Sequence, residues 1–232
     1  MYDIVFISYQ EPNADSNWEL LKSRFPFAKR VHGVKGIHQA HITAASKCFT
    51  DMIWVVDGDA VVLDTFNFDY LPHDTEYVFV WRSKNPVNDL EYGNGGIKLL
   101  PRLMTLNMDT SKPDMTTSIS TKFKPVKVVS NITTFNTDPF NTWKSAFREC
   151  CKLASAIIDR QKQDETVERL RIWCTTGIGR TYGDCSIAGA LAGRVYGTDN
   201  RGNSDTLRMI NNFEWLQLVF VGQFPHMEKE IL

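Results

Sequence analysis

The chain has no excess of charge of either sign. Its 232 residues include 26 Lys and Arg against 27 Asp and Glu, which gives a formal net charge of −1 at pH 7. Proteins that bind nucleic acid mainly through its phosphates usually have a basic surplus. The sequence therefore does not support a purely electrostatic nucleic-acid binder, although local basic patches are compatible with this balance. The hydrophobic share of 43% is ordinary for a globular protein.

Cysteine pairs with the spacing of metal sites are also missing. The five cysteines stand at positions 48, 150, 151, 174 and 185, and none forms a C-x-x-C pair. Neither a structural zinc site nor a disulfide framework is expected, and reduced thiols in a cytoplasm are the plain interpretation. No apolar run approaches the roughly 20 residues of a membrane span. The start, MYDIVFISYQ, is typical of a strand rather than of a signal peptide.

Short apolar runs alternate with helical patterns over the first hundred residues. Residues 4–9 (IVFISY) and 52–56 (MIWVV) are the clearest, because they are nearly continuous apolar runs rich in β-branched and aromatic residues. Such runs are typical of strands buried on both faces of a parallel sheet. Further strands are expected at residues 28–32, 77–81 and 97–100, with helices at 15–25 and 37–48. This order predicts an α/β fold with a central, mostly parallel sheet flanked by helices.

The second half of the chain has weaker signals. Residues 107–127 are rich in Thr, Ser, Lys and Asp and are expected to form a long surface loop. Apolar residues at three- and four-residue intervals predict a helix over 140–163, and another is expected at 183–193. No repeat, low-complexity tract or linker is visible, so a single domain over residues 1–232 is expected.

An acidic turn is the strongest local signal for chemistry. Asp57-Gly58-Asp59 follows directly on the expected strand at 52–56, at the edge where open α/β sheets bind ligands. Carboxylates are preferred ligands of Mg²⁺ and Mn²⁺, which commonly bridge them to a diphosphate. Gly58 would let the phosphates approach the backbone. The alternative is an ordinary turn whose two acids face water.

The residues around this turn resemble a known family. Residues 36–59, GIHQAHITAASKCFTDMIWVVDGD, are similar to the glycine, alanine-rich helix and strand that lead to the D-x-D turn of GT-A glycosyltransferases, which have a Rossmann-type sheet. The resemblance implies that Asp57, Gly58 and Asp59 hold a metal and the donor diphosphate. It also implies donor contacts from the end of the first strand and from the second helix, by Ser8, Tyr9, Glu11, Lys35, Gly36 and His41.

A second segment resembles the same family. Residues 92–99, YGNGGIKL, are similar to the part that approaches the transferred sugar, which implies roles for Asn94, Gly95 and Gly96 in binding the donor. A glycine cluster before a strand is equally typical of a bulge or a turn.

Catalytic acids follow from the resemblance as well. Asp184 stands where inverting members carry the general base, with Asp89 and Glu91 as substitutes, although an Asp at a helix start is also an ordinary N-cap. A retaining enzyme would need no such base. His226 matches the histidine that often completes the metal shell near the C-terminus, but a single histidine there is more often only exposed.

The acceptor is suggested by a looser likeness. Residues 79–99 and 134–149 resemble small glycosyltransferase-like proteins of tailed, T-even-like bacteriophages, some of which add glucose or arabinose to 5-hydroxymethylcytosine in DNA. Trp143, Lys144 and Arg148 interleave aromatic and basic residues on one helix and could bind such DNA. The alternative is that the aromatic residue belongs to the core and the basic residues to the solvated face of the helix.

The sequence thus predicts transfer of a sugar from a nucleoside diphosphate, such as UDP-glucose or UDP-arabinose, with Mn²⁺ or Mg²⁺ as cofactor. Residues 1–100 would bind the nucleotide-sugar and residues 101–232 the acceptor, in the host cytoplasm if a phage encodes the chain, without a membrane. A saccharide, lipid or protein acceptor is the first alternative. A nucleotidyltransferase is disfavoured because QEPNAD, rather than a glycine-rich phosphate loop, follows the first strand. A non-catalytic carbohydrate- or DNA-binding protein is the alternative from another class.

Overall fold

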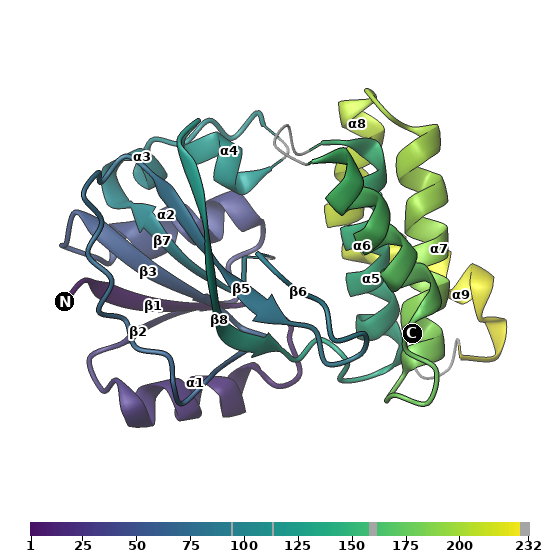
Figure 1. Cartoon of the computed structure of the whole chain (residues 1–232), viewed down its shortest axis with the longest axis horizontal. Coiled ribbons are helices and arrows are strands. Elements are labelled where there is room, and N and C mark those ends of the chain that lie inside the picture. The colour runs from purple at the N-terminus through teal and green to yellow at the C-terminus, as the bar shows by residue number, and fades with distance from the viewer. Residues whose placement is uncertain (94, 113, 158–161, 228–232) are drawn as a thin grey trace. The chain divides into compact units, whose positions relative to one another are not determined.

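The computed structural model describes residues 1–93, 95–112, 114–157 and 162–227, which belong to two compact units, Met1–Thr134 and Phe135–Leu232 (Figure 1). The boundary between the units lies after Thr134, whereas the sequence suggested two halves that meet at residue 100. Whether the units work as the single domain expected from the sequence stays a prediction.

The first unit is built on one eight-stranded sheet. The strands follow the order β2-β1-β3-β7-β5-β8-β4, and β6 pairs with β5 outside this path. Their bounds are β1 (Asp3–Ser8), β2 (Lys29–His32), β3 (Met52–Asp57), β4 (Ala60–Val62), β5 (Val78–Lys84), β6 (Glu91–Tyr92), β7 (Ile97–Pro101) and β8 (Phe123–Thr133).

The sheet is mixed. β1 pairs in parallel with β2 and with β3, and β5 pairs in parallel with β8, but β7 runs antiparallel to both β3 and β5. The α/β fold is therefore confirmed, while the prediction of a mostly parallel sheet is wrong. All five residues of β7 are buried. Such a continuous apolar run indicates a central strand, but it does not indicate whether the strand is parallel or antiparallel to its neighbours. The connecting segments decide that direction.

The long loop expected at residues 107–127 is a second correction. This stretch contains α4 (Met115–Ile119) and the start of β8, whose eleven residues pair with β5 and with β4. In the first half of β8, Lys124, Pro125, Lys127 and Val128 are exposed, and the residues between them are half-buried. This half of the strand is largely solvated, so a search for apolar runs does not detect it.

Helices cover both faces of the sheet (Figure 1). Successive strand side chains point to opposite faces. Ile4 and Phe6 of β1 therefore pack in the core on the side of α1 (Ala14–Arg24), whereas Val5 packs with α2 (Ile37–Ser46) and α4. A short helix, α3 (Arg102–Leu106), directly follows β7 and contacts α2.

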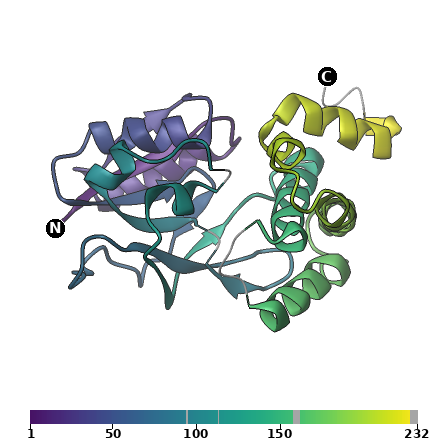
Figure 2. The same cartoon turned by 90° about the horizontal axis from the view of Figure 1, so that it is seen from above.

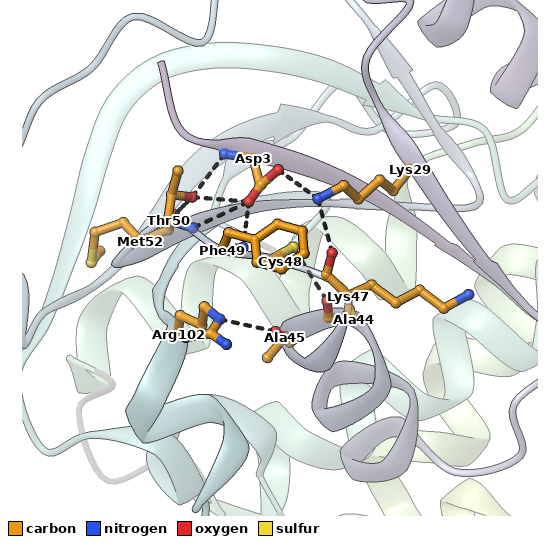
Figure 3. A network of polar contacts seen from close by, with 10 residues as sticks. All are labelled: Asp3, Lys29, Ala44, Ala45, Lys47, Cys48, Phe49, Thr50, Met52 and Arg102. Carbon is orange, nitrogen blue, oxygen red and sulfur yellow. Dashed lines mark hydrogen bonds and ion pairs between the residues drawn. The ribbon is translucent and has the colours of Figure 1, made fainter.

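The amino end of β1 is fixed by one half-buried carboxylate (Figure 3). Asp3 accepts hydrogen bonds from Lys29 Nζ at 2.7 Å and from the backbone N–H groups of Phe49 at 2.7 Å and Thr50 at 3.2 Å. Burial opposes ionisation of Asp3, but these donors outweigh it and lower the pKa below 3.8. The contact therefore ties β1 to β2 and to the segment that enters β3.

All the regular elements among the described residues of the second unit are helices (Figure 2). Its elements are α5 (Pro139–Ser155), α6 (Gln163–Thr175), α7 (Gly183–Asp199), α8 (Ser204–Leu207), η1 (Arg208–Asn211), α9 (Phe213–Gln223) and η2 (Pro225–Met227). The helix predicted over 140–163 instead ends at Ser155, where Ala156 takes the left-handed conformation with φ 55°.

Glycines let α7 lie directly against the backbone of α5. A Cβ added at Gly189, Gly193 or Gly197 would come well within 3.0 Å of a carbonyl oxygen of α5. The three glycines are four residues apart, so they form one stripe along the helix. No larger residue fits along this stripe without moving one of the two helices.

Candidate functional site

The acidic turn stands at the end of the buried strand β3, as predicted. The backbone carbonyl of Asp59 accepts hydrogen bonds from the N–H of Thr134 at 2.7 Å and from its hydroxyl at 2.8 Å. The carbonyl of Gly58 accepts one from Asn17 Nδ2 at 2.9 Å. The turn is therefore held by Thr134, which directly follows β8, and by Asn17 of α1, and Asp57 and Asp59 are half-buried.

A buried lysine neutralises the first acid of the turn. Lys98 Nζ lies 2.7 Å from Asp57 Oδ1, with 3% of the lysine side chain and 35% of the aspartate side chain exposed. The same ammonium donates to the carbonyl of Gly95, and the Asp57 N–H donates to the carbonyl of Gly96 at 2.9 Å. These bonds join the acidic turn to the glycine segment. From the sequence, only the family resemblance had indicated that the two segments belong to one site.

Lys98 was not among the residues predicted from the sequence. The signal was nevertheless present, because it is the single charged residue in the apolar strand IKLLP. Lysine is almost never fully buried unless it is paired, so its position in such a strand indicates a buried acidic partner. Register places Lys98 opposite Val55 on β3, two residues before Asp57.

Three carboxylates converge on the turn. A Cβ added at Gly58 would lie 2.8 Å from Glu11 Oε2 and 3.0 Å from Ser8 Cβ, so the glycine makes room for these two residues. Burial, followed by the negative charges of Asp57 and Glu11, raises the pKa of Asp59 from 3.8 to about 7. The turn therefore holds more negative charge than Lys98 alone neutralises.

This unneutralised charge is the observation that fits a divalent cation. Mg²⁺ bound with a diphosphate often uses only one or two protein carboxylates and fills its shell with water and phosphate oxygens. Among the described residues, no three His, Cys, Asp or Glu side chains form a group that could hold a metal by themselves. Asp57 already has a cationic partner, whereas the raised pKa of Asp59 indicates a carboxylate that a bound cation would stabilise, so a metal would bind through Asp59 first.

The predicted residues at the end of β1 do gather beside the turn. Glu11 Oε2 accepts a hydrogen bond from the Tyr9 N–H at 2.7 Å. Ser8 is buried, and its hydroxyl lies 2.9 Å from His32 Nδ1 and 3.3 Å from Arg30 Nε. Arg30 and His32, both on β2, were missed because nothing in the sequence tells which strand will pair beside β1.

The predicted residues of the α2 region divide into two environments. Lys35 and Gly36 are exposed, and Gly36 has the positive φ of 94° that a glycine tolerates at this helix start. His41, in contrast, is 2% exposed, and its Nδ1 bonds the carbonyl of Ile37 at 2.8 Å. Burial, followed by the charge of Lys98, lowers the pKa of His41 to about 3. The imidazole is therefore neutral and packed, without the exposed edge that a donor contact requires.

The glycine segment is partly described. Asn94 lies outside the described residues. Gly95 has φ 92°, and a Cβ added at Gly96 would lie 2.6 Å from Asn131 Nδ2 and 2.9 Å from Ser83 Oγ. Both glycines are thus explained by a tight turn over a buried polar network, which is the alternative that the sequence left open. This explanation does not test a role in sugar binding.

The substitute acids stand on the hairpin that β5 and β6 form. Asp89 has φ 58° and an ion pair of 3.4 Å with Lys84. Glu91 is exposed and is the register partner of Lys84. Asp89 is thus paired with Lys84, and Glu91 is the neighbour of the same lysine across the pairing of β5 with β6.

Asp184 and His226 belong to the second unit. Asp184 is exposed in the first turn of α7, whose N-cap is Tyr182, so the alternative of an Asp184 N-cap is wrong. Its carboxylate lies instead where the helix dipole favours negative charge. His226 is exposed in η2. Their roles as base and metal ligand stay predictions.

The predicted acceptor residues on α5 divide between the core and the half-buried part of the helix. Trp143 has no exposed surface, stacks on Phe147 and donates to Gln223 Oε1 at 2.8 Å. Its predicted contact with an acceptor is wrong, because a fully enclosed indole offers no face to a base. Lys144 and Arg148 both lie over the ring of Phe213, with distances of 4.4 Å and 5.3 Å to its centroid.

Comparison with known proteins adds no assignment. No protein-family model matches the chain, and no curated protein is significantly similar to it. Throughout the part of the chain that the structure describes, no helix combines the length and the apolar character needed to cross a membrane. The function must therefore be argued from the site itself.

Proposed function

We propose that this protein is a metal-dependent glycosyltransferase of GT-A type. It would transfer a sugar, such as glucose or arabinose, from a UDP-sugar to an acceptor hydroxyl, with 5-hydroxymethylcytosine in DNA or its glycosylated form as the acceptor. The observation that supports the proposal most is the rigid Asp57-Gly58-Asp59 turn at the carboxyl end of a central strand, joined through Lys98 to the glycine segment.

The site offers the charges that such a reaction requires. Asp59, assisted by Asp57, would hold Mn²⁺ or Mg²⁺, which when bound neutralises the charge that grows on the leaving diphosphate. Lys98 keeps Asp57 in place and adds a fixed positive charge beneath the turn. Ser8, Tyr9 and Glu11 stand at the adjacent strand end, where the nucleoside would lie.

The proton of the acceptor hydroxyl needs a base if the reaction inverts configuration. The acceptor oxygen forms the new bond to the anomeric carbon, the bond from that carbon to the diphosphate breaks, and the proton passes to a carboxylate. Asp184 is the proposed base, because it is exposed and ionisable at a helix start. A positioned base of this kind typically contributes about a hundredfold to ten-thousandfold in rate.

The test combines donor, metal and acceptor in one assay. The protein is incubated with Mn²⁺ or Mg²⁺, a panel of UDP-sugars, and either 5-hydroxymethylcytosine DNA or unmodified DNA, and the nucleosides are then analysed by mass spectrometry. A mass increase of one sugar on 5-hydroxymethylcytosine, absent without divalent cation, is expected. Failure to hydrolyse or transfer any UDP-sugar under all these conditions would refute the enzyme assignment.

Two variants separate chemistry from folding. Asp59→Asn should abolish transfer while the protein stays folded, because the substitution removes an acid whose ionisation the fold disfavours. Asp69→Asn changes an exposed acid of the same unit and should leave the rate unchanged. Equal rates for both variants would remove the acidic turn from the mechanism.

A further inference from the structure

The second unit has a cavity that the proposed function does not use. It measures about 380 Å³ and is formed by α5, α6, α7 and the residues that follow α5 and α7. Its described lining residues are Leu153, Ala154, Ala156, Gln163, Thr166, Val167, Leu170, Arg194, Thr198 and Arg201. This volume lies in the range of small-molecule sites. Several of these residues are exposed, so the cavity opens to solvent.

The lining joins an apolar floor to a basic rim. Leu153 and Ala154 from α5 and Leu170 from α6 supply aliphatic surface, while Arg194 and Arg201 supply two guanidinium groups. No acidic side chain is present among the lining residues that the structure describes. The cavity therefore has two positive charges that no described residue of its lining neutralises, and these charges favour an anion.

Local contacts fix one of these arginines and give two acids of α6 partners of their own. Arg201 donates to the carbonyl of Ala154 at 2.7 Å, which fixes its guanidinium at the cavity. Glu165 of α6 is paired with Arg169 at 3.2 Å, and Glu168 with Arg171 at 2.6 Å, so two of the three acids of this helix have partners of their own.

Arg194 acts toward the interior as well as toward solvent. The thiol of Cys174 lies one helical turn beyond Leu170, and its pKa is lowered to about 7, first by a hydrogen bond with Cys150 and then by the charge of Arg194. The positive charge of the Arg194 guanidinium therefore acts on Cys174 as well as on the opening of the cavity.

We infer that this cavity binds a small amphipathic anion, with a phosphate or carboxylate group on Arg194 and Arg201 and an aliphatic or planar body on the floor of Leu153 and Leu170. Guanidinium groups match the geometry of such anions and hold them by charge-assisted hydrogen bonds. The inference concerns the second unit alone and stands independently of the proposed transferase site.

Three probes test the two halves of this ligand class on the full chain. Hexyl phosphate has both parts, inorganic phosphate has only the anionic group, and hexan-1-ol has only the apolar body. Binding is followed by chemical-shift changes of the arginine Nε–H groups in NMR titrations. Hexyl phosphate should bind saturably with a Kd of about 1 mM or tighter, as suits a ligand of its size, and at least about tenfold more tightly than either partial probe.

Variants locate the binding. Arg194→Gln and Arg201→Gln should each weaken hexyl phosphate binding on the order of tenfold, because each removes a charged donor. Arg180→Gln is the matched control, since this exposed arginine of the same unit does not line the cavity. Val167 is 56% exposed, so Val167→Glu should repel the anion without unfolding the helix, whereas Val167→Gln should bind nearly as the parent does.

The outcomes are distinct. Weakening by the arginine variants and by Val167→Glu, but not by their controls, supports the inference. Equal binding of inorganic phosphate or of hexan-1-ol would overturn the amphipathic class. Absence of saturable binding up to about 20 mM, or binding that no cavity variant alters, would overturn the site. None of these results depends on sugar transfer, so this inference and the transferase proposal can fail independently of each other.

Discussion

The ion pair between Lys98 and Asp57 gives the sharpest test of the site. Lys98→Met keeps the length of the side chain and removes its charge. Asp57 then loses its cation beside Asp59 and Glu11, whose negative charges are already felt at the turn. The variant should therefore be less stable than the parent, and most of the loss should disappear once Asp57 is also neutral.

The size of the expected loss of stability follows from the burial of the ion pair. Removing one partner of a fully buried pair costs about 3–5 kcal/mol. Here the lysine is 3% exposed but the aspartate is 35% exposed, so water stabilises the carboxylate that remains. We expect Lys98→Met to cost about 1–3 kcal/mol of unfolding free energy, and the pair to show a coupling of about 1–2 kcal/mol in a double-mutant cycle with Asp57→Asn.

Urea denaturation of the four proteins of this cycle at pH 7 provides the measurement. A second cycle with Lys122→Met and Glu76→Gln serves as the control, because this pair has a similar distance of 2.6 Å but both of its side chains are exposed. The control should show much weaker coupling. Coupling at the Lys98 pair no larger than at the control would refute the view that burial makes this contact strong.

Three further predictions rest on other contacts. Gly193→Ala should destabilise the protein by about 1–3 kcal/mol in urea denaturation, since its Cβ would strike the Phe147 carbonyl oxygen, whereas Gly222→Ala, in open space within α9, should be neutral or slightly stabilising. Asp3→Asn should cost about 1–2 kcal/mol at pH 7. That cost should fade as the pH falls from 3.8 through the lowered pKa of the folded state, and a constant cost would contradict the role of its charge. Asp59→Asn, measured without divalent cations, should change stability little at pH 4. It should stabilise the protein above pH 7, because the parent loses stability as the pH rises from 3.8 toward the raised pKa of about 7.

The central strands and their helices could be predicted because each carries its own signal. The run at 52–56 is buried on both faces in β3, and the expected helix at 37–48 is α2 (Ile37–Ser46). β8 could not be found in this way, since its exposed half reads as a polar segment and pairing with β5 makes it a strand. β8 can be identified as a strand only from its pairing with β5.

The candidate site shows the same division. The acidic turn was found because two carboxylates follow an apolar strand directly. Its neutralisation by Lys98 was not found, because the two residues are 41 positions apart and meet only through the antiparallel register of β3 and β7. Trp143 was misjudged because an aromatic residue beside basic ones looks the same in sequence whether it faces a ligand or the core.

The amino-acid sequence by itself determined the local features of this protein: the apolar strands, the α2 helix, the absence of a basic surplus and the place of the acidic turn. Only the tertiary structure decided which strands run antiparallel, which charges meet at Asp57, and that two arginines border a cavity in the second unit. The physical reason is that strand and helix patterns arise from neighbouring residues, whereas burial and charge neutralisation depend on residues that folding brings together from distant parts of the chain.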